Sequence, residues 1–188
     1  MPNSSTVFDD HIMALVEKIK PASVLDIGAG RGKYGKLLRR RFGDTIRVDA
    51  LEIDRSYPDA FDLLKTYDAV LAESAVGFFD VYNRSTLVYD LIIAGDVLQD
   101  IKKSDGVDCL HEWVCHAPDV IVVVPMDICQ LFEDGHETFR SCWGPVDFEY
   151  WLSDVRVDEI KDGGRFDGCR ILCAHIPSCA KEVHHARK

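Results

Sequence analysis

The sequence predicts an α/β fold built on a doubly wound, mostly parallel sheet, and three observations carry that prediction. Short apolar runs alternate with segments of helical periodicity over most of the 188 residues. Strands and helices that alternate at these lengths form crossover units of a parallel sheet. A glycine-rich turn follows the first apolar run, and a turn-rich segment near the end separates two further runs. That last pattern predicts a hairpin, so one strand at the edge runs antiparallel.

The first half of the chain predicts a regular succession of elements. An apolar stripe at helical spacing ends before Pro21 and predicts the first helix. Pro58 stands near the start of another helical segment, where proline is well tolerated. We expect helices over 7–19, 33–41 and 57–66 and strands over 23–27, 46–53 and 69–72.

The second half continues the alternation and then departs from it. Residues 89–96 and 119–124 are predicted strands with apolar centres, as expected when both faces of a sheet are covered. Residues 105–116 between them predict a helix, whereas residues 75–82 carry no clear pattern. Two final strands, 155–160 and 169–176, flank a connection over 162–168 that is too short for a crossover helix.

The glycine-rich turn carries the strongest functional signal. Glycines stand at positions 28, 30 and 32, directly after the strand that contains Asp26 and before the helix that begins near Lys33. A strand, a tight turn and a helix N-terminus in this order build a nucleotide-binding crevice in open α/β sheets. Because glycine has no Cβ atom, the turn can take positive φ and a ligand can approach its N–H groups closely.

A second acid strengthens this interpretation. Glu52 ends the second predicted strand and lies roughly 20 residues beyond the glycines, the spacing at which an acid binds ribose hydroxyls in doubly wound folds. Asp54 lies close to it and could be mistaken for it. A dinucleotide fingerprint would need glycine at position 33, where the chain has Lys33.

The pattern that remains, D-x-G-x-G-x-G from Asp26 to Gly32, resembles the first motif of class I S-adenosylmethionine-dependent methyltransferases. The resemblance covers about residues 20–176 and implies a Rossmann-like sheet of seven strands with an antiparallel C-terminal edge hairpin. It implies that the glycine turn cradles the amino-acid end of S-adenosylmethionine, that Asp26 helps to hold its ammonium, and that Glu52 binds both ribose hydroxyls.

A later stretch resembles the fourth motif of the same family. Residues 89–93 and 96–101 match it, except that Gln99-Asp100 replaces the usual Glu-His pair, so a histidine that serves some members is missing. For the adenine end, the family places an acid or small polar residue after the third strand. The cofactor-binding residues implied by the resemblance are Asp26, Gly28, Gly30, Gly32, Glu52, Ile53, Glu73, Ser74, Asp96 and Val97.

The catalytic candidates follow the fourth and fifth strands. The segment 135–148 resembles a pattern found after strand five in a subset of uncharacterised small-molecule methyltransferases of this class. His136 in that segment and Asp96 are candidate bases for a hydroxyl acceptor, because oxygen nucleophiles of high pKa benefit from one. Trp143 is interpreted as a packing anchor of the same segment. The expected reaction transfers a methyl group to a small molecule such as a sugar or metabolite.

Composition limits the other possibilities. A net charge of −10 disfavours nucleic acid as a partner. No apolar run approaches the roughly 18 residues of a membrane span, and the polar start of the chain argues against secretion. The seven cysteines form no C-x-x-C pair, which indicates free thiols, a reducing cytoplasmic compartment and no metal site. We expect an N-terminal helix (1–20), a single methyltransferase domain (21–177) and a polar tail (178–188).

Two alternatives stay open at this point. The altered fourth motif also fits a catalytically idle, methyltransferase-like binding module. A nicotinamide-dependent reductase is a further alternative, against which Lys33 and the terminal hairpin count. The acceptor, its nucleophilic atom and the oligomeric state have no readable signal in the sequence.

Overall fold

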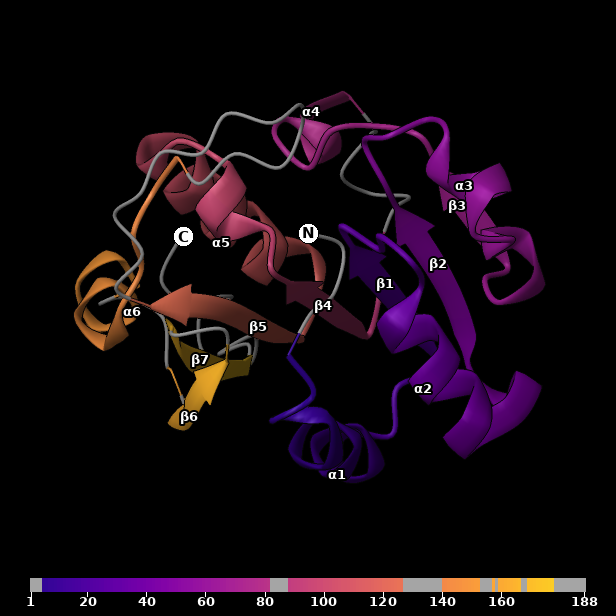
Figure 1. The fold of residues 1–188 in the computed structure, drawn as a ribbon, viewed down its shortest axis with the longest axis horizontal. Coiled ribbons are helices and arrows are strands. Elements are labelled where there is room, and N and C mark those ends of the chain that lie inside the picture. Colours follow the sequence, from indigo (N-terminus) through magenta and orange to yellow (C-terminus); the bar gives the residue numbers. More distant parts are fainter. Residues whose placement is uncertain are drawn as a thin grey trace, which may run out of the picture.

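The structure is a computed structural model, which describes residues 5–81, 88–126, 140–152, 157, 159–166 and 169–177. Within these residues a seven-stranded sheet has the order β3-β2-β1-β4-β5-β7-β6 (Figure 1). The strands are β1 (Ser23–Ile27), β2 (Arg47–Leu51), β3 (Ala69–Leu71), β4 (Leu91–Gly95), β5 (Asp119–Met126), β6 (Glu159–Phe166) and β7 (Cys169–Pro177). Strands β1 to β5 pair in parallel, and β7 is antiparallel to both β5 and β6. The predicted fold class is confirmed.

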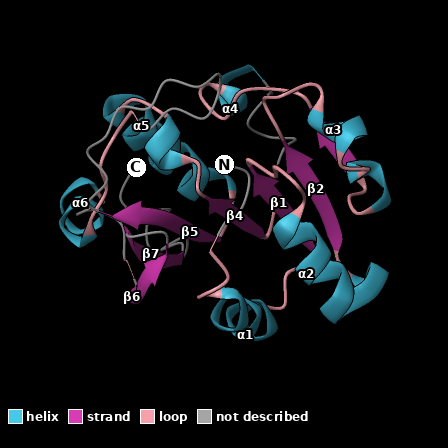
Figure 2. Ribbon diagram, viewed as in Figure 1, coloured by secondary structure: helices cyan, strands magenta, loops and turns pink. Residues whose placement is uncertain are grey.

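Helices cover both faces of the sheet (Figure 2). On one face lie α1 (Asp9–Ile19) and α2 (Lys33–Phe42), and on the other lie α4 (Phe78–Val81), α5 (Lys103–His116) and α6 (Pro145–Trp151). All five residues of β4 are buried as a result, which explains its apolar centre. In the described part of the chain, no helix is long and apolar enough to cross a membrane.

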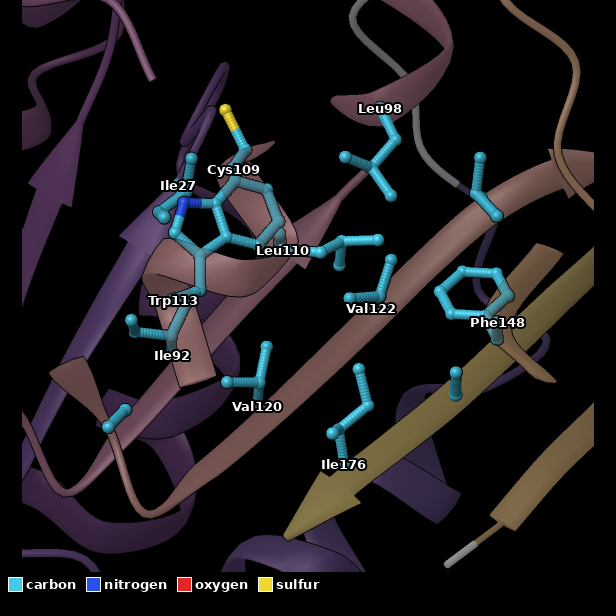
Figure 3. Packing of buried hydrophobic residues seen from close by; sticks show 14 of the residues in the cluster. Ile27, Ile92, Leu98, Cys109, Leu110, Trp113, Val120, Val122, Phe148 and Ile176 are labelled. Carbon is cyan, nitrogen blue, oxygen red and sulfur yellow. The ribbon is translucent and has the colours of Figure 1, made fainter. Parts of the chain in front are cut away.

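Each face of the sheet has its own hydrophobic core. Successive side chains of a strand point to opposite faces, so Ile92 joins the core under α5 whereas Ile93 joins the core under α1 and α2. Figure 3 shows the first of these cores, where Leu110 and Trp113 of α5 lie over Val120 and Val122 of β5. Because β1 pairs in parallel with both β2 and β4, the carboxyl ends of these three strands meet at one edge of the sheet. The two cores keep the strands in place.

Most of the predicted elements are found within two residues of their expected ends, but the helix over 57–66 is wrong. It is broken into a short helix α3 (Tyr57–Ala60) and a 3₁₀ turn at Leu63–Lys65. Between them Asp62 has a φ of +52°, in the left-handed region that aspartate tolerates better than most residues. The break lets Leu63 and Tyr67 turn into the core, where they are almost fully buried.

The terminal hairpin and its second strand over 169–176 are confirmed, but the bounds of its first strand and of the connection are wrong. Strand β6 begins at Glu159 and extends through the segment 162–166, which was expected to be the connection. Gly163 and Gly164 lie inside β6, where the pairing with β7 shifts between Asp162 and Arg165. Strand β6 is the edge strand, and the antiparallel β7 lies one position further in.

Candidate functional site

The glycine turn leaves β1 and crosses toward the end of β2. Gly28, Gly30 and Gly32 have φ angles of +70°, +53° and +74°, so each is in the left-handed region that favours glycine. The N–H groups of Gly28 and Ala29 both donate to the carbonyl oxygen of Leu51, at 2.8 and 3.2 Å. The predicted tight turn is therefore present, and its anchor is the last residue of the neighbouring strand.

Gly28 is also in close contact with the turn after β4. A Cβ atom built on Gly28 would lie 2.4 Å from Cγ2 of Val97, far inside van der Waals contact, whereas one on Gly30 would meet nothing nearer than 3.9 Å. Two of the predicted cofactor-binding residues, Gly28 and Val97, are thus packed directly against each other.

We expect Gly28→Ala to destabilise the protein more than Gly30→Ala. Both changes place a side chain at positive φ, which costs roughly 1–2 kcal/mol. Only Gly28→Ala adds overpacking against Val97, worth about 1–3 kcal/mol more. Denaturant unfolding of the two variants measures the difference, and equal losses in the free energy of unfolding would contradict the close packing of Gly28 on Val97.

Glu52 connects the end of β2 to the glycine turn. Its Oε2 accepts a hydrogen bond from the N–H of Gly30 at 2.7 Å, and its Oε1 accepts one from the N–H of Asp54 at 2.9 Å. The residue is only 5% exposed. A carboxylate can accept about four hydrogen bonds, so both oxygens keep acceptor capacity for a ligand. The Oδ1 of Asp54 accepts hydrogen bonds from the N–H and hydroxyl of Ser56.

Asp26 is buried beneath the same turn. Its Oδ2 accepts a hydrogen bond from the Tyr67 hydroxyl at 2.5 Å, and its Oδ1 has no hydrogen-bond partner among the described residues. Burial raises the pKa of Asp26 to about 7, and the charge of Glu52 adds to the rise. The Tyr67 hydroxyl, the Gly35 N–H and Lys33 act in the opposite direction. A cation close to Oδ1 would stabilise the ionised form of Asp26 at this buried place.

The turn after β4 holds Asp96 in a rare backbone conformation. Asp96 has a φ of +56°, and its N–H donates to the carbonyl oxygen of Val123. Strained residues of this kind gather at ligand sites, where the surrounding structure holds them. Here the amide of Gln99, which is buried, donates to the Asp96 carbonyl oxygen at 2.5 Å. The glutamine that departs from the family motif therefore supports the turn that carries Asp96.

The segment after β5 docks on this same turn. The N–H groups of Arg140 and Ser141 donate to the carbonyl oxygen of Gln99, and the Ser141 hydroxyl and Trp143 indole N–H donate to that of Leu98. Trp143 is 2% exposed, so its interpretation as a packing anchor is confirmed. His136, the other predicted catalytic residue, lies outside the described residues.

The adenine-end candidates follow β2 and β3. Ile53 comes directly after the buried Glu52 and is 48% exposed. Glu73 is exposed, and the Ser74 hydroxyl accepts a hydrogen bond from the N–H of Val76. All three lie beyond the carboxyl ends of their strands, where ligands bind in open α/β sheets.

Sequence reasoning missed two tyrosines that surround Asp26. Tyr67 contacts Asp26 directly, and Tyr34 of α2 is buried with a hydroxyl that has no hydrogen-bond partner among the described residues. Burial raises the pKa of Tyr34 well above its usual value. A Cβ on Gly95 would lie 2.3 Å from the Tyr34 ring, so this glycine makes room for it. No sequence pattern signals either tyrosine, since their roles depend on contacts between distant elements.

The comparisons with known proteins agree with this fold. No family profile and no curated protein matches the sequence. Among solved structures, the methyltransferase domain of a bacterial CtHen1 has a TM-score of 0.62 at 18% identity, covering 93% of this chain and 100% of that one. A Burkholderia thailandensis 1,6-didemethyltoxoflavin N1-methyltransferase with bound S-adenosylhomocysteine has a TM-score of 0.66 at 14% identity, covering 92% and 78%.

A third similar structure is the plantazolicin methyltransferase BpumL in complex with S-adenosylhomocysteine. Its TM-score is 0.62 at 12% identity, and the match covers 93% of this chain and 86% of that chain. At such identities the likeness concerns the fold. The chain therefore has the fold of class I S-adenosylmethionine-dependent methyltransferases, as the resemblance of its motifs predicted.

Proposed function

We propose that this protein binds S-adenosylmethionine at the carboxyl edge of its sheet and transfers the methyl group to a small-molecule acceptor. One observation carries the proposal. Two buried carboxylates, Asp26 of β1 and Glu52 directly after β2, lie at the glycine turn, and both keep acceptor capacity that the described residues do not use. The cofactor carries an ammonium and a ribose diol, and these hydrogen-bond donors need acceptors of this kind.

Each residue has a role in this proposal. Glu52 accepts hydrogen bonds from the ribose hydroxyls, and Asp26 faces the ammonium. Gly28, Gly30 and Gly32 let the amino-acid end approach the main chain, and the exposed Ile53 contacts the adenine. Glu73 and Ser74 offer polar groups to the adenine edge, and Asp96 with Val97 lines the crevice. When bound, the cofactor supplies an electrophilic methyl group on a sulfonium.

The acceptor proposed here is a hydroxyl. In-line methyl transfer asks the protein mainly to align the nucleophile with the methyl group and to exclude water. A hydroxyl also has to lose its proton, and His136 or Asp96 serves as the base. Asp96 directly follows β4 and precedes Val97, which packs on Gly28, and its left-handed backbone is held by Gln99; these contacts support Asp96 as a candidate base.

The test begins with calorimetric titration of the purified protein with S-adenosylmethionine and S-adenosylhomocysteine. We expect dissociation constants in the micromolar range for both, and the absence of binding in folded protein would overturn the proposal. Turnover of S-adenosylmethionine is then measured against a panel of hydroxyl, amine, carboxylate and thiol acceptors. Binding without turnover across the panel would favour the idle binding module, and binding of NADH instead would favour the reductase.

A further inference from the structure

Tyr67 is held in one orientation by two hydrogen bonds. Its hydroxyl donates to Oδ2 of Asp26 at 2.5 Å and accepts from the N–H of Gly35 at 3.2 Å. The side chain is 3% exposed. A phenol has a single proton to donate, and that proton goes to the carboxylate, while a lone pair of the oxygen accepts from Gly35.

The ring of Tyr67 is fitted against the glycine turn and the start of α2. A Cβ on Gly35 would lie 2.4 Å from the ring carbon Cζ, and one on Gly32 would lie 3.3 Å from Cε2. Tyr67 therefore contacts the last glycine of the motif and the first turn of the helix, while its hydroxyl reaches β1. Tyr67 therefore connects β1, the glycine turn and α2.

The Asp26 carboxylate is left asymmetric by this arrangement. Oδ2 is bonded to Tyr67, and Oδ1 is buried without a hydrogen-bond partner among the described residues. The charged and titratable groups around it are Lys33 and Tyr34 of α2, Glu52 at the end of β2, and Asp96 near Tyr34. The ammonium of Lys33 acts on Asp26 only through its charge, since it forms its ion pair with Asp9 at 2.7 Å. A buried carboxylate oxygen without a partner is costly unless a ligand or water meets it.

We infer that Tyr67 is a positioning residue for the cofactor: it holds Oδ2 of Asp26 and leaves Oδ1, which has no hydrogen-bond partner among the described residues, for the ammonium of the amino-acid end. The inference rests on the proposed function, because it assigns that ammonium to the crevice. It adds a residue outside the glycine motif, contributed by the segment between α3 and β3, whose hydroxyl lowers the pKa of the motif's acid against the effect of burial.

The wild-type protein provides the first measurement. Because burial places the pKa of Asp26 at about 7, the fraction ionised rises about tenfold between pH 6 and pH 8. We expect the affinity for S-adenosylhomocysteine to rise by a similar factor. 5′-Methylthioadenosine, which keeps the adenosine and the sulfur but lacks the amino-acid group, should bind with an affinity that does not change over this range. Equal pH profiles for the two ligands would overturn the inference.

The variant Tyr67→Phe tests the hydroxyl itself and keeps the ring that fills the space beside the glycines. We expect about tenfold weaker binding of S-adenosylhomocysteine at pH 7, as for loss of a hydrogen bond to a charged group. The pH at which affinity rises should also move upward, because the hydroxyl lowers the pKa of Asp26. Affinity for 5′-methylthioadenosine should stay within about twofold.

Tyr89→Phe is the matched control. Tyr89 is 4% exposed, and its hydroxyl donates to Oδ2 of the buried Asp49 at 2.9 Å. This tyrosine belongs to the core on the opposite face of the sheet, so loss of its hydroxyl should cost stability without changing the pH profile of ligand binding. If Tyr67→Phe behaves like Tyr89→Phe, the inference is overturned while the proposed function stands. If neither ligand binds the wild type, both fall.

Discussion

Replacing Asp26 by asparagine is expected to weaken binding of S-adenosylhomocysteine about 100-fold at pH 8 and, at the same pH, to make the ligand-free protein more stable. The affinity falls because a neutral amide replaces the buried carboxylate that faces the ammonium, and loss of one partner of such a pair costs several kcal/mol. Binding of 5′-methylthioadenosine should be unchanged, since it has no ammonium.

The gain in stability follows from the sign of the pKa shift. Burial raises the pKa of Asp26 from 3.8 to about 7, so the folded protein binds the proton more tightly than the unfolded chain does. The protonated Asp26 carboxyl therefore makes its full contribution to the free energy of unfolding below about pH 4, and this contribution is lost as the pH rises through 7. The Asp26→Asn variant has no such proton to lose, so we expect a gain of up to about 4 kcal/mol at pH 8.

Denaturant unfolding of the wild type and Asp26→Asn at pH 5 and pH 8 measures this effect. The stability difference between the two proteins should shrink toward pH 5, where most of the wild-type carboxyl is protonated in the folded state. A variant that is less stable than the wild type at pH 8 would show that Asp26 is better stabilised as a carboxylate than its burial indicates. A substitution that weakens ligand binding but raises the free energy of unfolding is expected at a ligand-binding residue, whereas a substitution in the core usually lowers stability.

Glu52→Gln should weaken binding of both S-adenosylhomocysteine and 5′-methylthioadenosine by roughly 100-fold, because the ribose is common to the two ligands. Glu52 uses Oε2 for Gly30 and Oε1 for Asp54. Glutamine has a single acceptor oxygen, so it cannot bond both N–H groups and also receive the ribose hydroxyls. Two charge-assisted hydrogen bonds of about 1.5 kcal/mol each account for the size of the effect.

Asp54→Asn is the control for Glu52→Gln. It neutralises an acid two residues away whose Oδ1 accepts hydrogen bonds from the N–H and hydroxyl of Ser56, so the affinity should change by no more than about twofold. Calorimetric titration of the two variants with both ligands gives the comparison. A Glu52→Gln variant that binds 5′-methylthioadenosine as tightly as the wild type would remove Glu52 from the ribose site.

The parts of the site that could be predicted from sequence are those encoded by local pattern. The positive φ angles at Gly28, Gly30 and Gly32 follow from glycine at alternate positions after a strand, and the position of Glu52 follows from the length of the intervening helix and strand. The prediction of a helix over 57–66 is wrong. The periodicity of this segment is compatible with a helix, but the chain turns at Asp62, which has a positive φ, and Leu63 and Tyr67 beyond the turn are buried in the core.

By itself the sequence determined the order of the elements, the class of sheet and the position of the glycine turn after β1, because these depend on periodicity, turn residues and spacing along the chain. Only the tertiary structure decided that Tyr67 meets Asp26, that Val97 closes on Gly28 and that Gln99 supports Asp96. The first two of these contacts join residues on separate elements. The charge state of Asp26 depends on burial by all of its neighbours together, which no local pattern encodes.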